Sequence, residues 1–251
     1  MARIRHLRNA PITEAIVDFR VSLPDDFRPD RLREAKERLA QHYPEALERK
    51  GLETRLEIAA GQPKEPQTRD LGFLGIWLKA EDQKSVAQFR VDGFTFNRLR
   101  PYTRWEEILP EALRLWAIYV ELTNPQSVTR VALRYINHMN LPSLGGKLSD
   151  YSDYIVTGPR WPLSTHEVLS SFATRVVLEY PERKMKANVV QTLEIGVKTS
   201  APSLLFDIDV YRSGDLEVSP TALKPIFDDL RHYKNEIFFG SLTDRFVEAF
   251  E

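Results

Sequence analysis

The sequence of 251 residues contains no cysteine, and this absence excludes several kinds of chemistry at once. Disulfide bonds, thiolate metal sites and cysteine nucleophiles all depend on that side chain. Long apolar runs are also missing, whereas a membrane helix needs about 20 apolar residues and a secretory signal about 7–15. The most apolar long segment, residues 105–122, is interrupted by Glu111, Arg114 and Glu121. We therefore expect a cytoplasmic protein without membrane contact.

The chain also lacks an excess of charge of either sign. Its 35 basic and 36 acidic residues give a net charge of −1, which provides no general attraction to nucleic acid or to an anionic membrane. A local basic patch can still exist. The hydrophobic share of 42% is ordinary for a globular chain and excludes a disordered one. A chain of this length can bury a sizeable core in one large domain or in two of ordinary size.

Alternation of apolar and polar residues predicts most of the strands. In residues 12–23, Glu14, Asp18 and Arg20 lie on one face and apolar side chains on the other, as in a half-buried strand. Further strands are predicted at residues 54–60, 71–79, 86–96, 128–141, 169–180, 187–199 and 203–211. Hairpin-length connections, such as residues 181–186, make the strands largely antiparallel.

Helical periodicity predicts helices at residues 28–43, 103–122, 221–234 and 242–250. In the second of these, Thr103 and Glu106 have the spacing of a capping box. Pro110 lies inside the same segment, and we expect it to kink the helix or to shift its start. The helix should end at Asn124, which precedes a proline.

The fold class expected from these elements is α+β, with a largely antiparallel sheet or incomplete barrel and with helices packed on its apolar face. In chain order the elements read β-α-β-β-β-α, then β, a short element, and β-β-β-α-α. Residues 1–125 and 126–251 are therefore interpreted as two pseudo-repeated halves of one compact unit, the second with an extra C-terminal helix. This interpretation rests on the order of elements alone, since no residues match between the two halves.

Five stretches carry a resemblance to a known family. They are Asn9-Ala-Pro-Ile-Thr-Glu14, Arg100-Pro-Tyr-Thr-Arg-Trp105, Arg130-Val-Ala-Leu-Arg-Tyr-Ile-Asn137 with Leu141-Pro142, Phe206-Asp-Ile-Asp209, and the ending from His232 through Phe238-Phe239 to Leu242-Thr243. With this spacing along the whole chain, the sequence resembles a sporadically distributed family of uncharacterised prokaryotic proteins of similar length. The resemblance brings no catalytic motif.

What the resemblance implies about function comes from the patchy distribution of the family. Such a distribution is typical of genes that travel with mobile elements or with bacterial conflict systems, antiphage defence among them. The resemblance therefore implies an accessory or interaction protein that acts with a protein partner or as a homo-oligomer.

A charged strand face supplies the first group of candidate ligand-binding residues. They are Arg130, Arg134 and His138 on one predicted strand, with Arg175, Glu179, Glu194 and Lys198 on its neighbours, and Asp207 with Asp209 as a candidate metal pair. If the sheet closes with this face inward, the arginines would hold a nucleotide or polyphosphate and the aspartates a divalent metal ion. If the sheet stays open, the same residues form a solvated face with cross-strand ion pairs.

The closed alternative would be a metal-dependent hydrolase like the triphosphate tunnel enzymes, whose signature is Glu-x-Glu-x-Lys. The nearest string here runs from Glu194 to Lys198 and has Gly196 in place of the second glutamate. No phosphate loop, zinc motif or nucleophile elbow is present. We therefore lean away from an enzyme, predict no catalytic residue, and expect a divalent metal only in the closed alternative and no other cofactor.

A second group of candidates stands at the start of the long predicted helix. Its members are Arg100, Tyr102, Arg104 and Trp105. Aromatic and basic side chains together can stack bases and bind phosphate, so this group is the candidate nucleic-acid site. In the other interpretation, Trp105 belongs to the apolar stripe of the helix and packs in the core.

Overall fold

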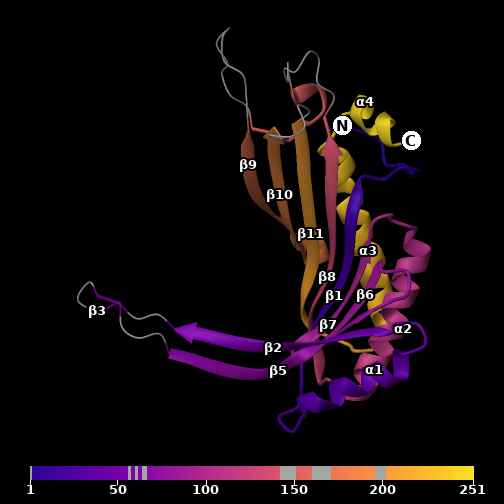
Figure 1. Ribbon diagram of the computed structural model, residues 1–251. Coiled ribbons are helices and arrows are strands. Elements are labelled where there is room, and N and C mark those ends of the chain that lie inside the picture. Colours follow the sequence, from indigo (N-terminus) through magenta and orange to yellow (C-terminus); the bar gives the residue numbers. More distant parts are fainter. Residues whose placement is uncertain are drawn as a thin grey trace.

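In the computed structural model, the alternating segments pair into one antiparallel open sheet (Figure 1). The structure describes residues 2–55, 58–59, 62–63, 67–141, 151–159, 171–195 and 202–251. Among these residues the sheet has nine strands, in the order β2 (Glu45–Arg55), β5 (Gln67–Lys79), β6 (Ser85–Arg90), β7 (Gly93–Leu99), β1 (Ile12–Ser22), β8 (Ser127–Asn140), β11 (Pro202–Leu216), β10 (Met185–Ile195) and β9 (Phe172–Tyr180). The short strands β3 (Ile58–Ala59) and β4 (Gln62–Pro63) pair separately.

Four α-helices accompany the sheet in the described residues. They are α1 (Glu34–Leu39), α2 (Trp105–Thr123), α3 (Pro220–Gly240) and α4 (Asp244–Val247), with short 3-10 turns η1 (Pro29–Arg33), η2 (Tyr151–Asp153), η3 (Pro181–Arg183) and η4 (Glu248–Phe250). The helices α2 and α3 lie on the same side of the sheet (Figure 1). None of the described helices is long and apolar enough to span a membrane. The α+β class and the antiparallel sheet are thus confirmed, and the sheet is open.

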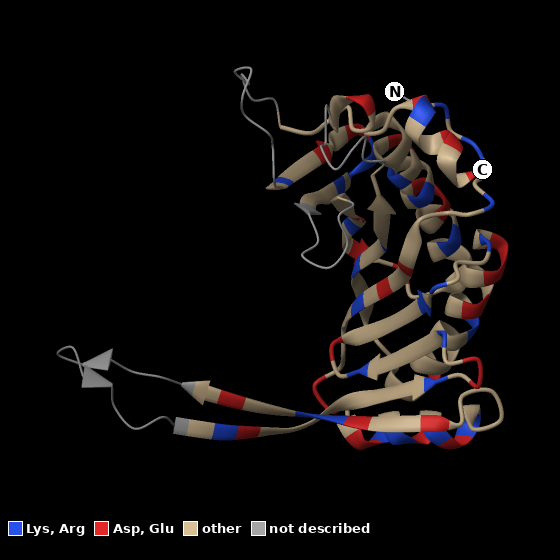
Figure 2. Ribbon diagram, turned by 45° about the horizontal axis from the view of Figure 1, so that its top comes forward, with Lys and Arg blue, Asp and Glu red and all other residues tan. Residues whose placement is uncertain are grey.

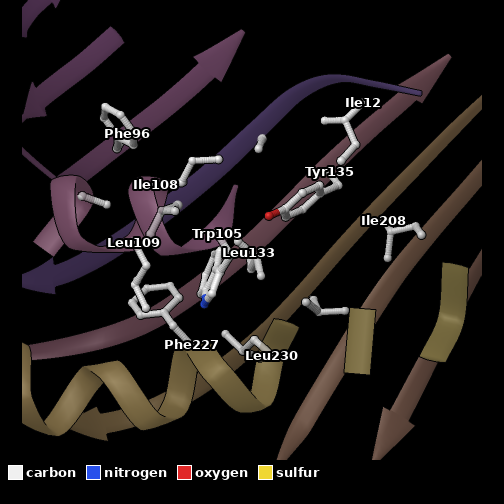
Figure 3. Packing of buried hydrophobic residues seen from close by; sticks show 14 of the residues in the cluster. Ile12, Phe96, Trp105, Ile108, Leu109, Leu133, Tyr135, Ile208, Phe227 and Leu230 are labelled. Carbon is white, nitrogen blue, oxygen red and sulfur yellow. The ribbon is translucent and has the colours of Figure 1, made fainter. Parts of the chain in front are cut away.

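The core lies between the sheet and the helices α2 and α3. Phe19 of β1 stacks on Trp116 of α2 with the ring centres 4.4 Å apart, and Phe227 of α3 meets the same phenylalanine edge-on. Trp105 packs beside Leu230 in the same layer (Figure 3). All five side chains are at least 96% buried, as the apolar stripes of the two helices predict.

Two strand predictions need correction at the N-terminal half of the sheet. Residues 86–96 are not one bent strand, because the hairpin of β6 and β7 turns at Val91 and Asp92. The pair Asp92-Gly93 is a strong hairpin signal in the sequence. Gly93 has φ +151°, and its backbone lies against the carbonyl of Phe19. A Cβ at that position would lie 1.9 Å from the Phe19 oxygen, so only glycine fits. The weak strand expected at residues 54–60 is also misplaced. The long strand in this region is β2, which precedes it and ends at Arg55, and among the described residues of this range only the two-residue strand β3 follows.

Several helix boundaries also differ from the predictions. The N-cap of α2 is Arg104, so Thr103 does not cap the helix, and the helix continues through Pro110. Asn124 ends α2 in a left-handed conformation, as expected. The helix expected at residues 28–43 is broken into η1 and α1, while α3 is longer than predicted and α4 is a single turn followed by η4. Tertiary packing extends or shortens helices in ways that local periodicity does not show.

The hairpin of β2 and β5 extends beyond the rest of the sheet (Figure 1). Pairing between β5 and β6 runs only from Gly75 to Lys79, whereas β2 and β5 stay paired as far as Arg55 and Gln67. We call residues 50–55 and 67–73 the arm; within the described residues these two segments pair only with each other. The arm leaves the sheet on the side opposite α2 and α3 (Figure 1).

Candidate functional site

The charged face of the central strands is organised around one buried carboxylate, that of Asp18 on β1. Its Oδ1 accepts hydrogen bonds from the Thr95 hydroxyl at 2.7 Å and from Arg90 at 3.0 Å. Its Oδ2 accepts from Arg20 and from Arg130, both at 3.3 Å. Only 8% of Asp18 is exposed. Donors from four strands therefore meet at a single acidic group.

The two predicted metal ligands are bound by arginines instead. Both oxygens of Asp209 accept hydrogen bonds from Arg130, at 2.9 and 3.1 Å, and the same guanidinium lies over the ring of Tyr211. Asp207 accepts from Arg134 at 2.5 and 2.8 Å. This hydrogen bond raises the pKa of Arg134, so the guanidinium stays charged. The described residues include no group of three or more acidic, histidine or cysteine side chains placed to hold a metal ion.

The remaining predicted ligand-binding residues do not join this network. Glu179 pairs with Lys186 at 2.6 Å near the end of β9. His138 and Arg175 are exposed and form no side-chain hydrogen bond or ion pair with any described residue. The side chain of Glu194 and the whole of Lys198 lie outside the described residues. Figure 2 shows acidic and basic residues interleaved along these strands, with no large area of one sign.

The predicted aromatic and basic cluster is divided between the core and the surface. Trp105 is buried and its indole N–H donates to Asp228 at 3.0 Å. The hydroxyl of Tyr102 lies 3.2 Å from that of Tyr135. Arg104 points outward and pairs with Glu107 at 3.3 Å, and Arg100 is exposed. Trp105 is therefore not available as a stacking surface, whereas Tyr102 and Arg104 line one open hollow of about 550 Å³.

A cavity of about 340 Å³ lies between the N-terminal segment and α3, on the helix side of the sheet. It is lined by Ile4, Arg5, His6, Leu7, Ala10, Pro11, Ile12, Tyr102, Asn137, Arg231, Lys234, Asn235, Phe238 and Phe239. This volume falls within the range of small-molecule sites. The described lining includes three cationic residues and no acidic one.

Lys234 is the most unusual residue of this cavity. It is only 8% exposed, and its Nζ lies 4.0 Å from the centre of the Tyr135 ring. It forms no hydrogen bond or ion pair with any described residue. Burial, followed by the positive charge of Arg231, lowers the pKa of Lys234 to about 7. A lysine in this state is a common feature of binding and catalytic sites.

Lys234 was missed by the sequence patterns, although a signal for it exists. The buried stripe of α3 consists of Leu223, Phe227, Leu230, Lys234 and Phe238. The spacing of these residues places the lysine at an inward position that otherwise takes an apolar side chain. A charged residue on the apolar stripe of a predicted helix is thus the pattern that would have found it.

A second hollow, of about 450 Å³, lies at the base of the arm. It is lined by Arg49, Leu74, Trp77, Gln88, Arg90, Val91 and Asp92. The guanidinium of Arg49 lies over the Trp77 ring at 4.3 Å, and Leu47 stands directly opposite the same tryptophan across the strand pair. Leu47 is 61% exposed. This hollow is therefore lined by an aromatic ring, and an exposed leucine lies beside it.

Comparison with known proteins does not assign this geometry to a family. No protein-family model matches the sequence, and no curated protein matches it either. The function must therefore be inferred from the residues themselves.

Proposed function

We propose that this protein acts by binding a protein partner, and that the arm and the hollow at its base make the contact. The observation that carries the proposal is the arm itself, which projects from the sheet (Figure 1). It also carries large apolar side chains that are exposed. Leu52 is 72% exposed and Leu71 is 43% exposed. A two-stranded ribbon is marginally stable in water by itself. A partner that packs on the arm would bury these leucines.

The apolar side chains at the arm base form a continuous strip toward the sheet. Leu71 and Leu74 both lie against Gly51, and Leu74 shares the hollow with Trp77. Leu47 extends the strip on the other side of Trp77. Tryptophan and arginine are among the residue types that contribute most to binding energy in protein interfaces, and here Arg49 lies over Trp77. An apolar side chain of a partner would fit beside Trp77.

The charges around this surface favour a protein over a nucleic acid. The arm carries Lys50, Arg55 and Arg69 together with Glu53 and Asp70, so its charges are mixed and nearly balanced. Binding to a phosphate backbone requires several unpaired cations, and its strength depends on their number. Mixed charges around an apolar centre are instead typical of protein interfaces.

Two further parts of the proposal rest on the sequence. We propose that the chain belongs to the prokaryotic family it resembles, and that its partner is encoded nearby. We also propose that the two halves are pseudo-repeats. The pairing order supports this, because the first long strand of each half pairs with its last, β1 with β7 and β8 with β11, and the other strands follow outward. In this arrangement the arm is a lengthened hairpin of the first half.

We expect the variant Leu52→Asp/Leu71→Asp to lose the partner while remaining folded, because both side chains are exposed. Wild-type and variant proteins would be affinity-purified from the native host, and the partner then mixed with each purified protein to measure Kd. A loss of tenfold or more in affinity is expected. The matched control is Val177→Asp, which changes a 54% exposed residue on the far edge strand β9.

Four outcomes decide this experiment. Loss of the partner by the arm variant alone supports the proposal. Equal binding by the arm variant and by wild type rejects the arm as the interface, and recovery of the wild-type protein as a partner-free monomer rejects the proposal as a whole. Self-association of the purified chain, measured by sedimentation and lost in the arm variant, would identify the partner as a second copy.

The alternative function, nucleotide or polyphosphate binding on the charged face, has one observation in its favour. A hollow of about 350 Å³ lies there, lined in part by Arg130, Arg134 and Asp209. The arginines of this hollow are already bound by aspartates, however, so an anionic ligand would have to displace a carboxylate. We therefore place this alternative second.

We expect tripolyphosphate, with or without Mg²⁺, to leave the unfolding temperature unchanged, because Arg130 and Arg134 in this hollow are already paired with aspartates. A thermal-shift titration checks this. A rise in unfolding temperature that Arg134→Gln abolishes, and that the exposed Arg183→Gln on η3 leaves intact, would restore the ligand-binding alternative.

A further inference from the structure

The cavity beside α3 is lined on one side by an N-terminal segment that is fixed at two points. The backbone N–H of Ala2 donates to the carbonyls of Phe239 and Leu242, and that of Asn9 donates to Phe250. Between these points, Arg5 pairs with Asp244 at 2.8 Å and also with Glu251. The segment is thus held across the end of α3 and forms one wall of this half-open cavity.

The cations that line this cavity differ in whether they are neutralised. Arg5 is paired with two carboxylates, and Arg231 lies 3.5 Å from Glu106. Lys234 has no acidic partner among the described residues. It lies over the face of Tyr135, which itself is 1% exposed. The one cation of the described lining that lacks a counter-ion is therefore also the most buried.

This arrangement is costly for folding, and packing does not explain it. A buried ammonium loses its hydration, and contact with an aromatic ring restores only part of that loss. A methionine would fill the same inward position on α3 without this cost. Buried charges in proteins are normally paired or bound to something. The missing counter-ion points to a ligand.

We propose that this cavity binds a small organic anion, with the Lys234 ammonium binding its charged group and the apolar residues Leu7 and Phe238 packing against its body. The cationic lining excludes a cationic ligand, and the mixed lining suits a compact anion with an apolar part. Carboxylates and phosphate monoesters share this chemistry, and the probes below distinguish them. The site is on the helix side of the sheet, whereas the arm projects from the opposite side.

Hexanoate, phenyl phosphate and inorganic phosphate are suitable probes, each titrated into the full-length protein by calorimetry at pH 6. We expect saturable one-to-one binding of at least one of the two organic anions. Lys234→Met should weaken that binding at least tenfold. The control is Lys224→Met, which alters an exposed lysine of the same helix that pairs with Asp228 at 2.8 Å, and it should bind like wild type.

The pH dependence of binding gives a second, independent readout. Affinity for the anion should fall as the pH rises from 6 to 9, because the ammonium of Lys234 loses its proton near pH 7. The other titratable or charged groups around it are Arg231 on the same helix, Tyr135 on β8, Tyr102 before α2, and Arg5 with His6 on the N-terminal segment. In Lys234→Arg, whose guanidinium does not titrate in this range, the decline should be absent.

Binding of hexanoate or of phenyl phosphate supports the proposal and identifies the charged group of the ligand. The absence of saturable binding by either organic probe would overturn it, as would equal affinity in Lys234→Met. Circular dichroism establishes that each variant is folded before it is titrated. Retention of the partner by Lys234→Met would show in addition that the cavity and the arm work separately.

Discussion

Lys234→Met should be more stable than the wild-type protein, by about 2–4 kcal/mol at pH 6. The variant removes a buried ammonium that has no counter-ion among the described residues and keeps an unbranched side chain of similar length. For a chain of this size, the unfolding temperature should rise by roughly 5–10 °C. Thermal unfolding in a buffer free of organic anions measures this difference. Most core substitutions destabilise proteins, so a gain of this size would be diagnostic.

The gain in stability of Lys234→Met over the wild-type protein should shrink as the pH rises. The direction of this change follows from the linkage between proton binding and folding. The pKa of Lys234 is about 7 in the folded protein and 10.5 in the unfolded chain. Between these values the unfolded chain binds more protons, so the wild-type protein gains stability with increasing pH. The full penalty is present below pH 7 and disappears as the pH approaches 10.5. Lys224→Met should follow the wild-type curve throughout, and a Lys234→Met protein less stable than wild type at pH 6 would contradict the prediction.

Asp18→Ala should destabilise the protein by about 3–5 kcal/mol, the largest loss expected on the charged face. Removal of this carboxylate leaves Arg90, Arg130 and the Thr95 hydroxyl without their shared acceptor. These groups are partly or fully buried, so water does not fully replace the lost contacts. Urea denaturation at pH 7 measures the change in the free energy of unfolding.

Asp92→Ala is the matched control for the same network. Asp92 pairs with Arg20 and Arg90 but has a side chain that is 56% exposed, so its removal should cost about 1 kcal/mol or less. A similar small cost for Asp18→Ala would show that the charged face is not a structural network. A large difference between the two variants would instead show that the face stabilises the sheet through its buried centre.

The charged face shows how far sequence patterns reach. Alternation along residues 128–141 correctly placed Arg130 and Arg134 on one face, because the direction of a side chain in a strand depends only on its position in that strand. The partners of these arginines depend on the register between β8 and β11, where Arg134 stands opposite Asp209 but pairs with Asp207. The alternation alone therefore favoured a set of ion pairs on a solvated face but left a ligand cleft open as the alternative.

The arm shows a second limit of prediction from the sequence. The segment of β2 is rich in charge and has little alternation, so its strand is stabilised by pairing with β5 and not by a local preference. The projection of the arm follows from the point at which β6 ends its pairing with β5, and that point is far away in sequence.

The sequence by itself determined the class of this protein: antiparallel strands with one apolar face, and two long helices whose stripes cover it. Both properties depend on periodicity within single segments, which is local. Only the tertiary structure decided that the sheet is open, that Asp18 and Asp209 bind the arginines beside them, and that Lys234 lies in a cavity without an ion-pair partner among the described residues. These properties depend on contacts between segments far apart in the chain. For Lys234 the contacts are with the N-terminal segment and β8, more than ninety residues away.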